Sequence, residues 1–325
     1  MTVPRELWTQ LQRAETLLVH ATAACVPERR AALMDGFDAP RDVLHLLHRV
    51  GSGFPRDEIR PEDYLARYPF SDLQLIRAEF ARLASHGLLV RLGDTFQLTA
   101  KGGGAIEVWM ERVAGLISAV PIDGITQEET RLLIACDEEI VESVRAAERS
   151  HGWPIFFHRL RGIRAETSPP ALWQHWQLVW TVLAASEDEE ESVRRERGMD
   201  PLEWFLRRQL WFVDRRPWRV RARSIEGLAA RAAGYAPLWD AKGACAEGIE
   251  RMRKEGVVAE DESGLRLSER GLEACDQDEQ EIDANLLSAW PAWSPRRIEQ
   301  LEGIVARINL ECARLIETHA RGEQR

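Results

Sequence analysis

The sequence predicts a mainly α-helical fold with small β-hairpins, built from two tandem copies of one unit. The stretch from Ser71 to Gly102 has the pattern of a capped helix followed by a tight hairpin. A similar stretch ends at Gly271, and segments with apolar residues at helical spacing flank both. With 325 residues, the chain is long enough for two units that each bury a core.

The first copy centres on a helix expected over residues 71–86. Ser71 is expected to cap its N-terminus, because a serine hydroxyl accepts hydrogen bonds from the first backbone N–H groups of a helix. Gly87 follows, and glycine readily takes the left-handed conformation that ends many helices. The apolar positions at helical spacing are Leu73, Ile76, Phe80 and Leu83. LLVRL and TFQLT then flank a Gly-Asp turn, which predicts a β-hairpin.

The second copy is visible as an internal repeat. LVRLGDTFQLTAKG, residues 89–102, aligns with VAEDESGLRLSERG, residues 258–271. Further along, LISAVP of the first half matches LLSAWP of the second. Near the start, PRELWTQL matches PPALWQHW. Matches that keep their order along both halves predict a tandem duplication.

The repeat divides the chain into three predicted segments. Residues 1–150 form the first copy and residues 169–325 the second. Residues 151–168 join them, and their apolar side chains predict a packed linker, because such side chains are mostly buried. Each copy has the predicted order of three helices, the capped helix, a hairpin and two long helices.

The helix and hairpin of Ser71–Gly102, which end in the pattern Leu-Thr-x-x-Gly, resemble the recognition helix and wing of the MarR-like winged helix-turn-helix family. In that family the first and last helices of two subunits interlock into a dimer. The resemblance and the repeat imply a fold that is mainly α with small β wings, in which two tandem winged helix-turn-helix units and their long flanking helices form an intrachain pseudo-dimer. They also imply a DNA-binding transcriptional regulator, with double-stranded DNA as partner and a small-molecule effector as a further ligand.

The outward face of helix 71–86 is expected to read DNA in the major groove. Gln74 and Arg77 have the side chains that bind adenine and guanine edges through paired hydrogen bonds. Arg82, Arg91 and Lys101 are expected to bind phosphates, which position a protein without reading sequence. Ser71 is included at the start of the helix. The alternative is that these are ordinary solvated polar residues.

A basic segment precedes the second capped helix. FLRRQLWFVDRRPWRVRARS, residues 205–224, has alternating arginines near its end, which predicts a strand with one basic face. Such a strand could bind a phosphate backbone. The candidate DNA-binding residues here are Arg215, Arg216, Arg219, Arg221 and Arg223. The alternative is that these arginines pair with the acidic runs at 187–191 and 276–283.

The second capped helix, WDAKGACAEGIERMRKEG, has fewer side chains that could read bases. Lys242 is its candidate DNA-binding residue. Gly243 and Gly248 each cost about 1 kcal/mol of helix stability relative to alanine. The second copy is therefore expected either to bind DNA asymmetrically, at an operator that is not a palindrome, or to act as a scaffold.

Four tryptophans are candidates for a ligand pocket. Trp173, Trp176 and Trp180 fall on one helical face. Trp290 lies at the corresponding break in the second copy. They either pack in the core or form an aromatic wall for a small effector, since ligand pockets are mostly apolar.

Composition limits the remaining function classes. Hydrophobic residues make up 45% and charged residues 30%, with a net charge of −10, which argues against a chain that coats nucleic acid indiscriminately. No signal sequence, membrane-length apolar run, metal-binding cysteine spacing or common catalytic motif is present, so we expect a cytoplasmic protein that is not an enzyme and has no cofactor or metal. The competing prediction is a winged-helix scaffold for protein interaction, or a small-molecule sensor, that has lost DNA binding. The chain is expected to act as a monomeric pseudo-dimer, with further dimerisation left open.

Overall fold

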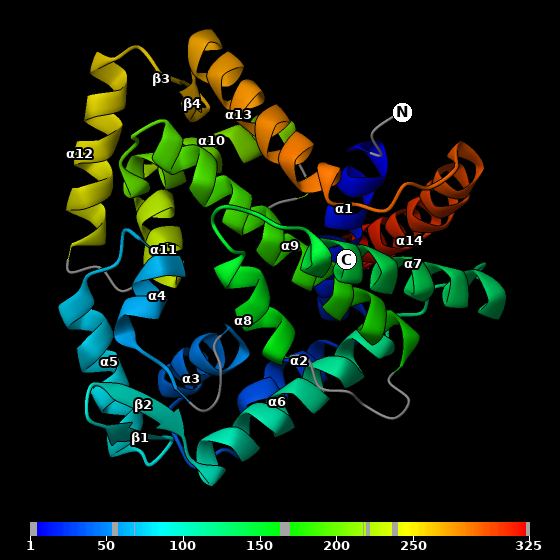
Figure 1. Cartoon of the computed structure of the whole chain (residues 1–325), viewed down its shortest axis with the longest axis horizontal. Helices are drawn as coiled ribbons and strands as arrows, with labels where there is room; N and C mark the ends of the chain where they lie inside the picture. The colour runs from blue at the N-terminus through cyan, green and yellow to red at the C-terminus, as the bar shows by residue number, and fades with distance from the viewer. Residues whose placement is uncertain are drawn as a thin grey trace. The chain divides into compact units, whose positions relative to one another are not determined.

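The computed structural model describes residues 5–53, 58–67, 69–162, 170–216, 218, 222–235 and 240–322. Over these residues the chain is mostly helical, with two small antiparallel sheets of two strands each (Figure 1). The prediction of a mainly α fold with small β elements is therefore confirmed.

The elements follow one another in an order that occurs twice. The first series consists of α1 (Arg5–Cys25), α2 (Pro27–Ala31), η1 (Ala32–Met34), α3 (Arg41–Gly53), α4 (Pro61–Arg67), α5 (Leu73–Ser85), β1 (Leu89–Leu92), β2 (Thr95–Leu98), α6 (Ala100–Ser118) and α7 (Gln127–Ala146). After α8 (Pro154–Gly162), the second series consists of α9 (Ala171–Glu196), α10 (Pro201–Arg215), α11 (Ile225–Tyr235), α12 (Ala241–Lys254), β3 (Val258–Asp261), β4 (Gly264–Leu267), α13 (Glu269–Ser288) and α14 (Pro295–Gly322). Except for α2 and η1, each element of the first series has a counterpart in the second.

The chain divides into two compact units that do not follow the halves of this order. The long-helix unit consists of Met1–Arg56, Leu98–Asp188 and Ala284–Arg325. The hairpin unit consists of Asp57–Gln97 and Glu189–Asp283, so it holds β1 and all of β2 except Leu98 from the first series, together with β3 and β4 from the second. Each half of the chain therefore contributes to both units.

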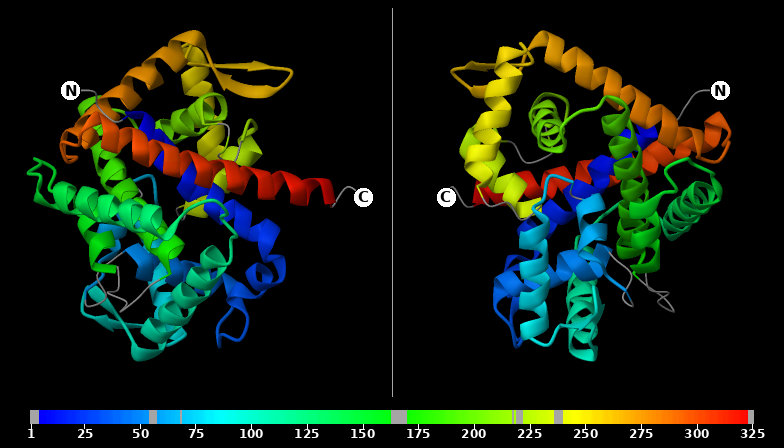
Figure 2. Two further views of the ribbon diagram at one scale, coloured as in Figure 1. Left: turned by 90° about the vertical axis from the view of Figure 1, so that its right-hand side faces the viewer. Right: turned by 60° about the vertical axis from the view of Figure 1, so that its left-hand side comes forward.

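In the long-helix unit, the first helix of each series contacts the last helix of the other. α1 lies along α14 (Figure 2), and Asn309 Nδ2 donates to Gln10 Oε1 at 2.8 Å. α9 contacts α7, where His175 Nδ1 lies 2.6 Å from Asp137 Oδ2 and both side chains are buried. Gln10 and His175 occupy matching positions in PRELWTQL and PPALWQHW. The two helix pairs are therefore reciprocal.

The start of α8 is held by a carboxylate from α9. Asp188 accepts hydrogen bonds from the backbone N–H groups of Ile155 and Phe156, at 3.0 and 2.9 Å. These N–H groups have no partner within the helix, so the buried carboxylate serves as a cap. Trp153, Ile155 and Phe156 are buried, as the apolar composition of this segment predicts.

In the hairpin unit, each hairpin also pairs with one residue from an earlier segment. Ile59 and Phe96 exchange backbone hydrogen bonds of 2.7 and 2.8 Å. In the second hairpin, the N–H of Leu265 donates to the carbonyl oxygen of Arg223 at 2.8 Å. The rings of Phe80 and Phe96 meet edge to face, with centroids 5.3 Å apart, and this contact joins α5 to its hairpin.

The cap of α5 is Asp72 and not Ser71. Asp72 Oδ1 accepts from the N–H groups of Gln74 and Leu75 at 2.7 and 3.0 Å. A carboxylate binds these N–H groups more strongly than a hydroxyl does, because its negative charge also faces the positive end of the helix dipole. Ser71 Oγ is buried and has no hydrogen-bond partner among the described residues, so the expected roles of Ser71 in capping and in DNA binding are not supported.

The repeated pattern of threonine or serine followed by glycine has a structural cause. Thr99 Oγ1 accepts from the N–H of Gly102 at 3.0 Å, and Ser268 Oγ accepts from the N–H of Gly271 at 3.1 Å. Each hydroxyl caps the helix that follows its hairpin. A Cβ atom on Gly271 would lie only 2.3 Å from the carbonyl oxygen of Val257, so the helix approaches the hairpin too closely for a side chain.

We expect Gly271→Ala to lower the free energy of unfolding by about 1–3 kcal/mol, because the added Cβ collides with backbone that cannot move freely. Gly303→Ala is the matched control, since Gly303 is also inside a helix but has open space around its Cβ position. That change should raise stability by up to about 1 kcal/mol through helix propensity. Chemical denaturation measures both. If both variants changed the free energy of unfolding in the same direction, the close approach of Gly271 to Val257 would be contradicted.

Candidate nucleic-acid interface

Helix α5 presents polar side chains on the face away from its core. Gln74, Arg77 and Arg82 are exposed, while Ile76 and Phe80 on the opposite face are buried. This is the orientation that the helical spacing predicts. The amide and guanidinium groups therefore lie on the solvent-exposed face of the helix.

Arg77 already has an acidic neighbour. Its Nη2 lies 2.7 Å from Oε1 of Glu62, in the first turn of α4, and both side chains are about half exposed. Hydrogen bonds from its own backbone N–H and from Arg77 lower the pKa of Glu62. An exposed ion pair of this kind contributes little to stability, so a phosphate or a base could replace Glu62 at small cost.

The first hairpin carries one cation and two exposed apolar side chains. Arg91 is exposed on β1, and its Nε donates to the carbonyl oxygen of Gly93 at 2.8 Å. Val90 and Leu92 beside it are 42% and 52% exposed. Lys101 belongs to the long-helix unit, where its Nζ lies 3.1 Å from Oδ2 of Asp38.

Helix α12, the counterpart of α5, uses its glycines for packing. A Cβ on Gly248 would lie 3.0 Å from Cδ1 of Leu206, so this glycine lets α12 approach α10 closely. The N–H of Gly243 donates to Asp240, the N-cap of the helix, at 2.8 Å. Lys242 is exposed and pairs with Glu226 at 2.8 Å.

The basic segment before α11 is largely occupied by ion pairs within the chain. Arg215 is the last residue of helix α10, not part of a strand, and it binds Asp276. Arg216 is buried and pairs with Glu279 at 2.7 Å, so it cannot reach a phosphate. The candidates Arg219 and Arg221 lie outside the described residues.

Arg223 lies farther along the same segment. Its Nη2 is 3.2 Å from Asp214 Oδ1, and its Nη1 donates to Ser263 Oγ at 2.8 Å. For the described arginines of this segment, the interpretation as internal ion pairs is therefore the one that fits, with the acids of the 276–283 run as the main partners.

Glu279 on α13 is the centre of the buried part of this network. Its two oxygens lie 2.5 Å from Arg208 and 2.7 Å from Arg216. The ring of Trp211 faces both guanidinium groups, at 4.7 and 5.5 Å from the ring centre. Burial by itself raises the pKa of Glu279, but the two arginines outweigh burial and lower this pKa. The carboxylate is therefore held in its charged form.

The candidate tryptophans of the long-helix unit pack on one another. The rings of Trp173 and Trp176 are stacked with centroids 5.3 Å apart, and those of Trp176 and Trp180 with centroids 4.9 Å apart. Arg159, which is buried, lies over the outer ring. Trp290 meets Trp8 edge to face at 5.8 Å. These contacts favour core packing over a ligand wall.

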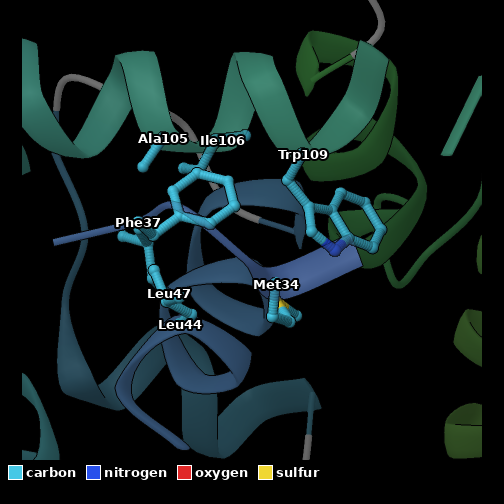
Figure 3. A pocket seen from close by; sticks show the side chains of 7 residues that line it. All are labelled: Met34, Phe37, Leu44, Leu47, Ala105, Ile106 and Trp109. Atoms are coloured by element: carbon cyan, nitrogen blue, oxygen red, sulfur yellow. The ribbon is translucent and has the colours of Figure 1, made fainter. Parts of the chain in front are cut away.

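A small apolar pocket lies elsewhere in the long-helix unit, between the α3 region and α6 (Figure 3). It encloses about 210 Å³, counting the space open to solvent. Its lining residues are Met34, Phe37, Leu44, Leu47, Ala105, Ile106 and Trp109. This volume is below the roughly 300–1,000 Å³ of typical small-molecule sites, and none of the candidate tryptophans lines it. An effector therefore stays a prediction.

Within the described residues, no three His, Cys, Asp or Glu side chains gather closely enough to hold a metal ion. No described helix has both the length and the apolar character needed to cross a membrane. Comparison of the chain with models of protein families, with curated proteins and with solved structures finds no match.

Proposed function

We propose that this chain is a DNA-binding transcriptional regulator that reads DNA with helix α5. The observation that carries the proposal is the exposed face of α5, where Gln74, Arg77 and Arg82 lie on one side of a helix whose other side is anchored in the core. A helix of this kind fits the major groove of B-DNA, which is about 12 Å wide.

Each exposed side chain has a distinct role in this proposal. Gln74 would pair with adenine and Arg77 with guanine, once Arg77 exchanges Glu62 for the base edge. Arg82 and Arg91 would contact phosphates on either side of the groove, which fixes the position of the helix. Base contacts then determine which sequence is bound.

The reciprocal helix pairs support the pseudo-dimer part of the proposal. α1 of the first half contacts α14 of the second half, and α9 of the second half contacts α7 of the first half. An isologous dimer has the same reciprocity between two subunits. In this proposal the two series of elements are two winged helix-turn-helix units joined in one chain.

A scaffold for protein interaction is the competing proposal. It is supported by Val90 and Leu92, which expose apolar surface on the first hairpin, and by the net charge of −10. DNA binding measured across salt concentrations separates the two proposals, because only phosphate contacts give a steep loss of affinity with salt.

We expect the double change Gln74→Ala and Arg77→Ala to weaken binding to a selected DNA sequence by at least about 30-fold, since two paired base contacts of about 1–3 kcal/mol each sum to about 2–6 kcal/mol. A duplex selected from a random library serves as the ligand. Fluorescence anisotropy measures its dissociation constant for the unsubstituted chain and the variant. Arg314→Ala is the control, because Arg314 is an exposed, ion-paired arginine on α14. Both positions on α5 are exposed, so the variant should fold normally. Equal affinity of the double variant and the unsubstituted chain would refute the role of α5.

A further inference from the structure

We infer that one chain contacts DNA through α5 and the first hairpin alone, and that α12 with the second hairpin stays off the DNA. This inference rests on the proposed DNA-binding function, and it sets how much DNA one chain covers. It follows from comparing the two copies position by position within the hairpin unit.

The buried residues of α5 and α12 fix the alignment of the two copies. With one constant shift along the chain, the buried face of α5 coincides with the buried face of α12. The coinciding residues are Ile76 with Cys245, Phe80 with Ile249, and Leu83 with Met252. The same shift places Gly87 on Gly256, and both glycines have positive φ angles, 69° and 72°. Matching positions therefore face the same way in the two copies.

At this register the second copy keeps a cation in place of Arg82 and of Lys101 but lacks the other side chains that would read or hold DNA. Gln74 corresponds to Gly243, and Arg77 corresponds to Ala246. Arg91 on the first hairpin corresponds to Glu260 on the second, so a positive charge is replaced by a negative one. A glutamate at that place would repel the phosphate that an arginine attracts.

Several cations of the second copy are paired with acids of the same copy, while Arg270, which corresponds to Lys101, donates to the carbonyl oxygen of Glu255 at 3.2 Å. Arg251, which corresponds to Arg82, pairs with Glu203 on α10. Arg266 on β4 lies 2.7 Å from Asp261 at the end of β3. The further pairs are Lys242 with Glu226, Arg253 with Glu260, and Lys254 with Glu250.

The tip of the second hairpin is acidic as well. Glu260, Asp261 and Glu262 follow one another there and are exposed. Where a DNA phosphate would meet the second hairpin, the surface is therefore negative, whereas the first hairpin carries one cation, Arg91, and one acid, Asp94. One chain should cover about one helical turn of DNA, whereas two active recognition helices would cover half-sites about 34 Å apart.

A matched pair of variants tests the inference on the full chain. Arg82→Gln and Arg251→Gln make the same change at corresponding positions of the two copies. The probe is a 30-base-pair duplex of mixed sequence (about three helical turns) at several salt concentrations. Arg82→Gln should weaken binding about 3- to 10-fold and reduce the salt dependence by roughly one phosphate contact. Arg251→Gln should leave both quantities unchanged.

Hydroxyl-radical footprinting on a selected duplex provides the second measurement. The inference requires one protected stretch of about one helical turn per chain. Two protected stretches, or an equal loss of affinity in Arg251→Gln, would overturn the inference and leave the DNA-binding function standing. No binding of the unsubstituted chain to any duplex would overturn both. Circular dichroism of both variants ensures that a loss of affinity is not a loss of folding.

Discussion

Replacing Glu279 by glutamine is expected to lower the free energy of unfolding by about 3–5 kcal/mol. The change keeps the shape of the side chain but removes the charge that lies between Arg208 and Arg216. Both arginines are buried, and Trp211 covers them, so neither can turn to water for compensation. Arg216 would then remain buried without its acid, and Arg208 would keep only Glu190, which lies 3.3 Å from its Nε. Urea denaturation followed by tryptophan fluorescence measures the loss.

Glu226→Gln is the matched control for this experiment. Glu226 pairs with Lys242, and both side chains are 67% exposed, so water replaces the lost partner. The control should unfold at the same urea concentration as the unsubstituted chain. If Glu279→Gln behaved like the control, the buried network would contribute nothing to stability.

The effect of Glu279→Gln should depend on pH. The two arginines lower the pKa of Glu279 in the folded chain against the opposing effect of burial. A lowered folded pKa gives stability that is fully present above the ordinary glutamate pKa of about 4.3 and is lost as the pH falls through the folded pKa. The difference in stability between the variant and the unsubstituted chain should therefore be largest above about pH 5 and shrink toward pH 3. A difference that grows on acidification would contradict this sign.

Trp173→Ala is expected to lower the free energy of unfolding by about 3–5 kcal/mol, as truncation of a fully buried aromatic side chain does. Trp173 has no exposed surface, and its ring is stacked on Trp176 at 5.3 Å. Removing it would leave a cavity and expose one face of the stack. Truncation of a tryptophan that lined an open ligand site would lower the free energy of unfolding far less, because water already reaches the surface of such a side chain. Denaturant titration of the two proteins distinguishes the two roles.

Leu310→Ala is the control for the tryptophan. Leu310 is an apolar side chain on α14 that is 67% exposed, so its removal should change stability by less than about 0.5 kcal/mol. If Trp173→Ala changed the free energy of unfolding as little as Leu310→Ala does, the result would favour the role of the tryptophans as ligand contacts over core packing.

Much of the secondary structure is determined by local sequence patterns. The apolar spacing of Ile76, Phe80 and Leu83 identifies the buried face of α5, and Gly87 ends that helix with a φ of 69°. The Gly-Asp turn joins β1 and β2 as expected. These features depend on residues within a few positions of one another, so the sequence contains what is needed to predict them. The cap of α5 is the local exception, because Ser71 and Asp72 are both good caps and the choice depends on where the first turn starts.

The internal repeat is also visible in the sequence, and the structure explains why certain residues recur in both copies. Thr99 and Ser268 recur because each caps a helix, and Gly271 recurs opposite Gly102 because no side chain fits against Val257 there. The recurring residues thus determine how the helix that follows each hairpin is capped and packed. They carry no information about a ligand, which is why the repeat predicts the order of elements better than the site.

The sequence by itself determined most of the helices, both hairpins and the repeated order of elements, since these follow from short-range spacing. It was wrong near Arg215, where it predicts a strand and the structure has the end of helix α10. Only the tertiary structure decided which arginines remain on the surface. Arg77 and Arg216 look alike in the sequence, yet Arg77 is exposed on α5 while Arg216 is buried against Glu279. That difference depends on α13 bringing its acids to the end of α10, from more than 60 positions away in the chain. A charge is accessible or buried according to its neighbours in space, and long-range packing chooses those neighbours.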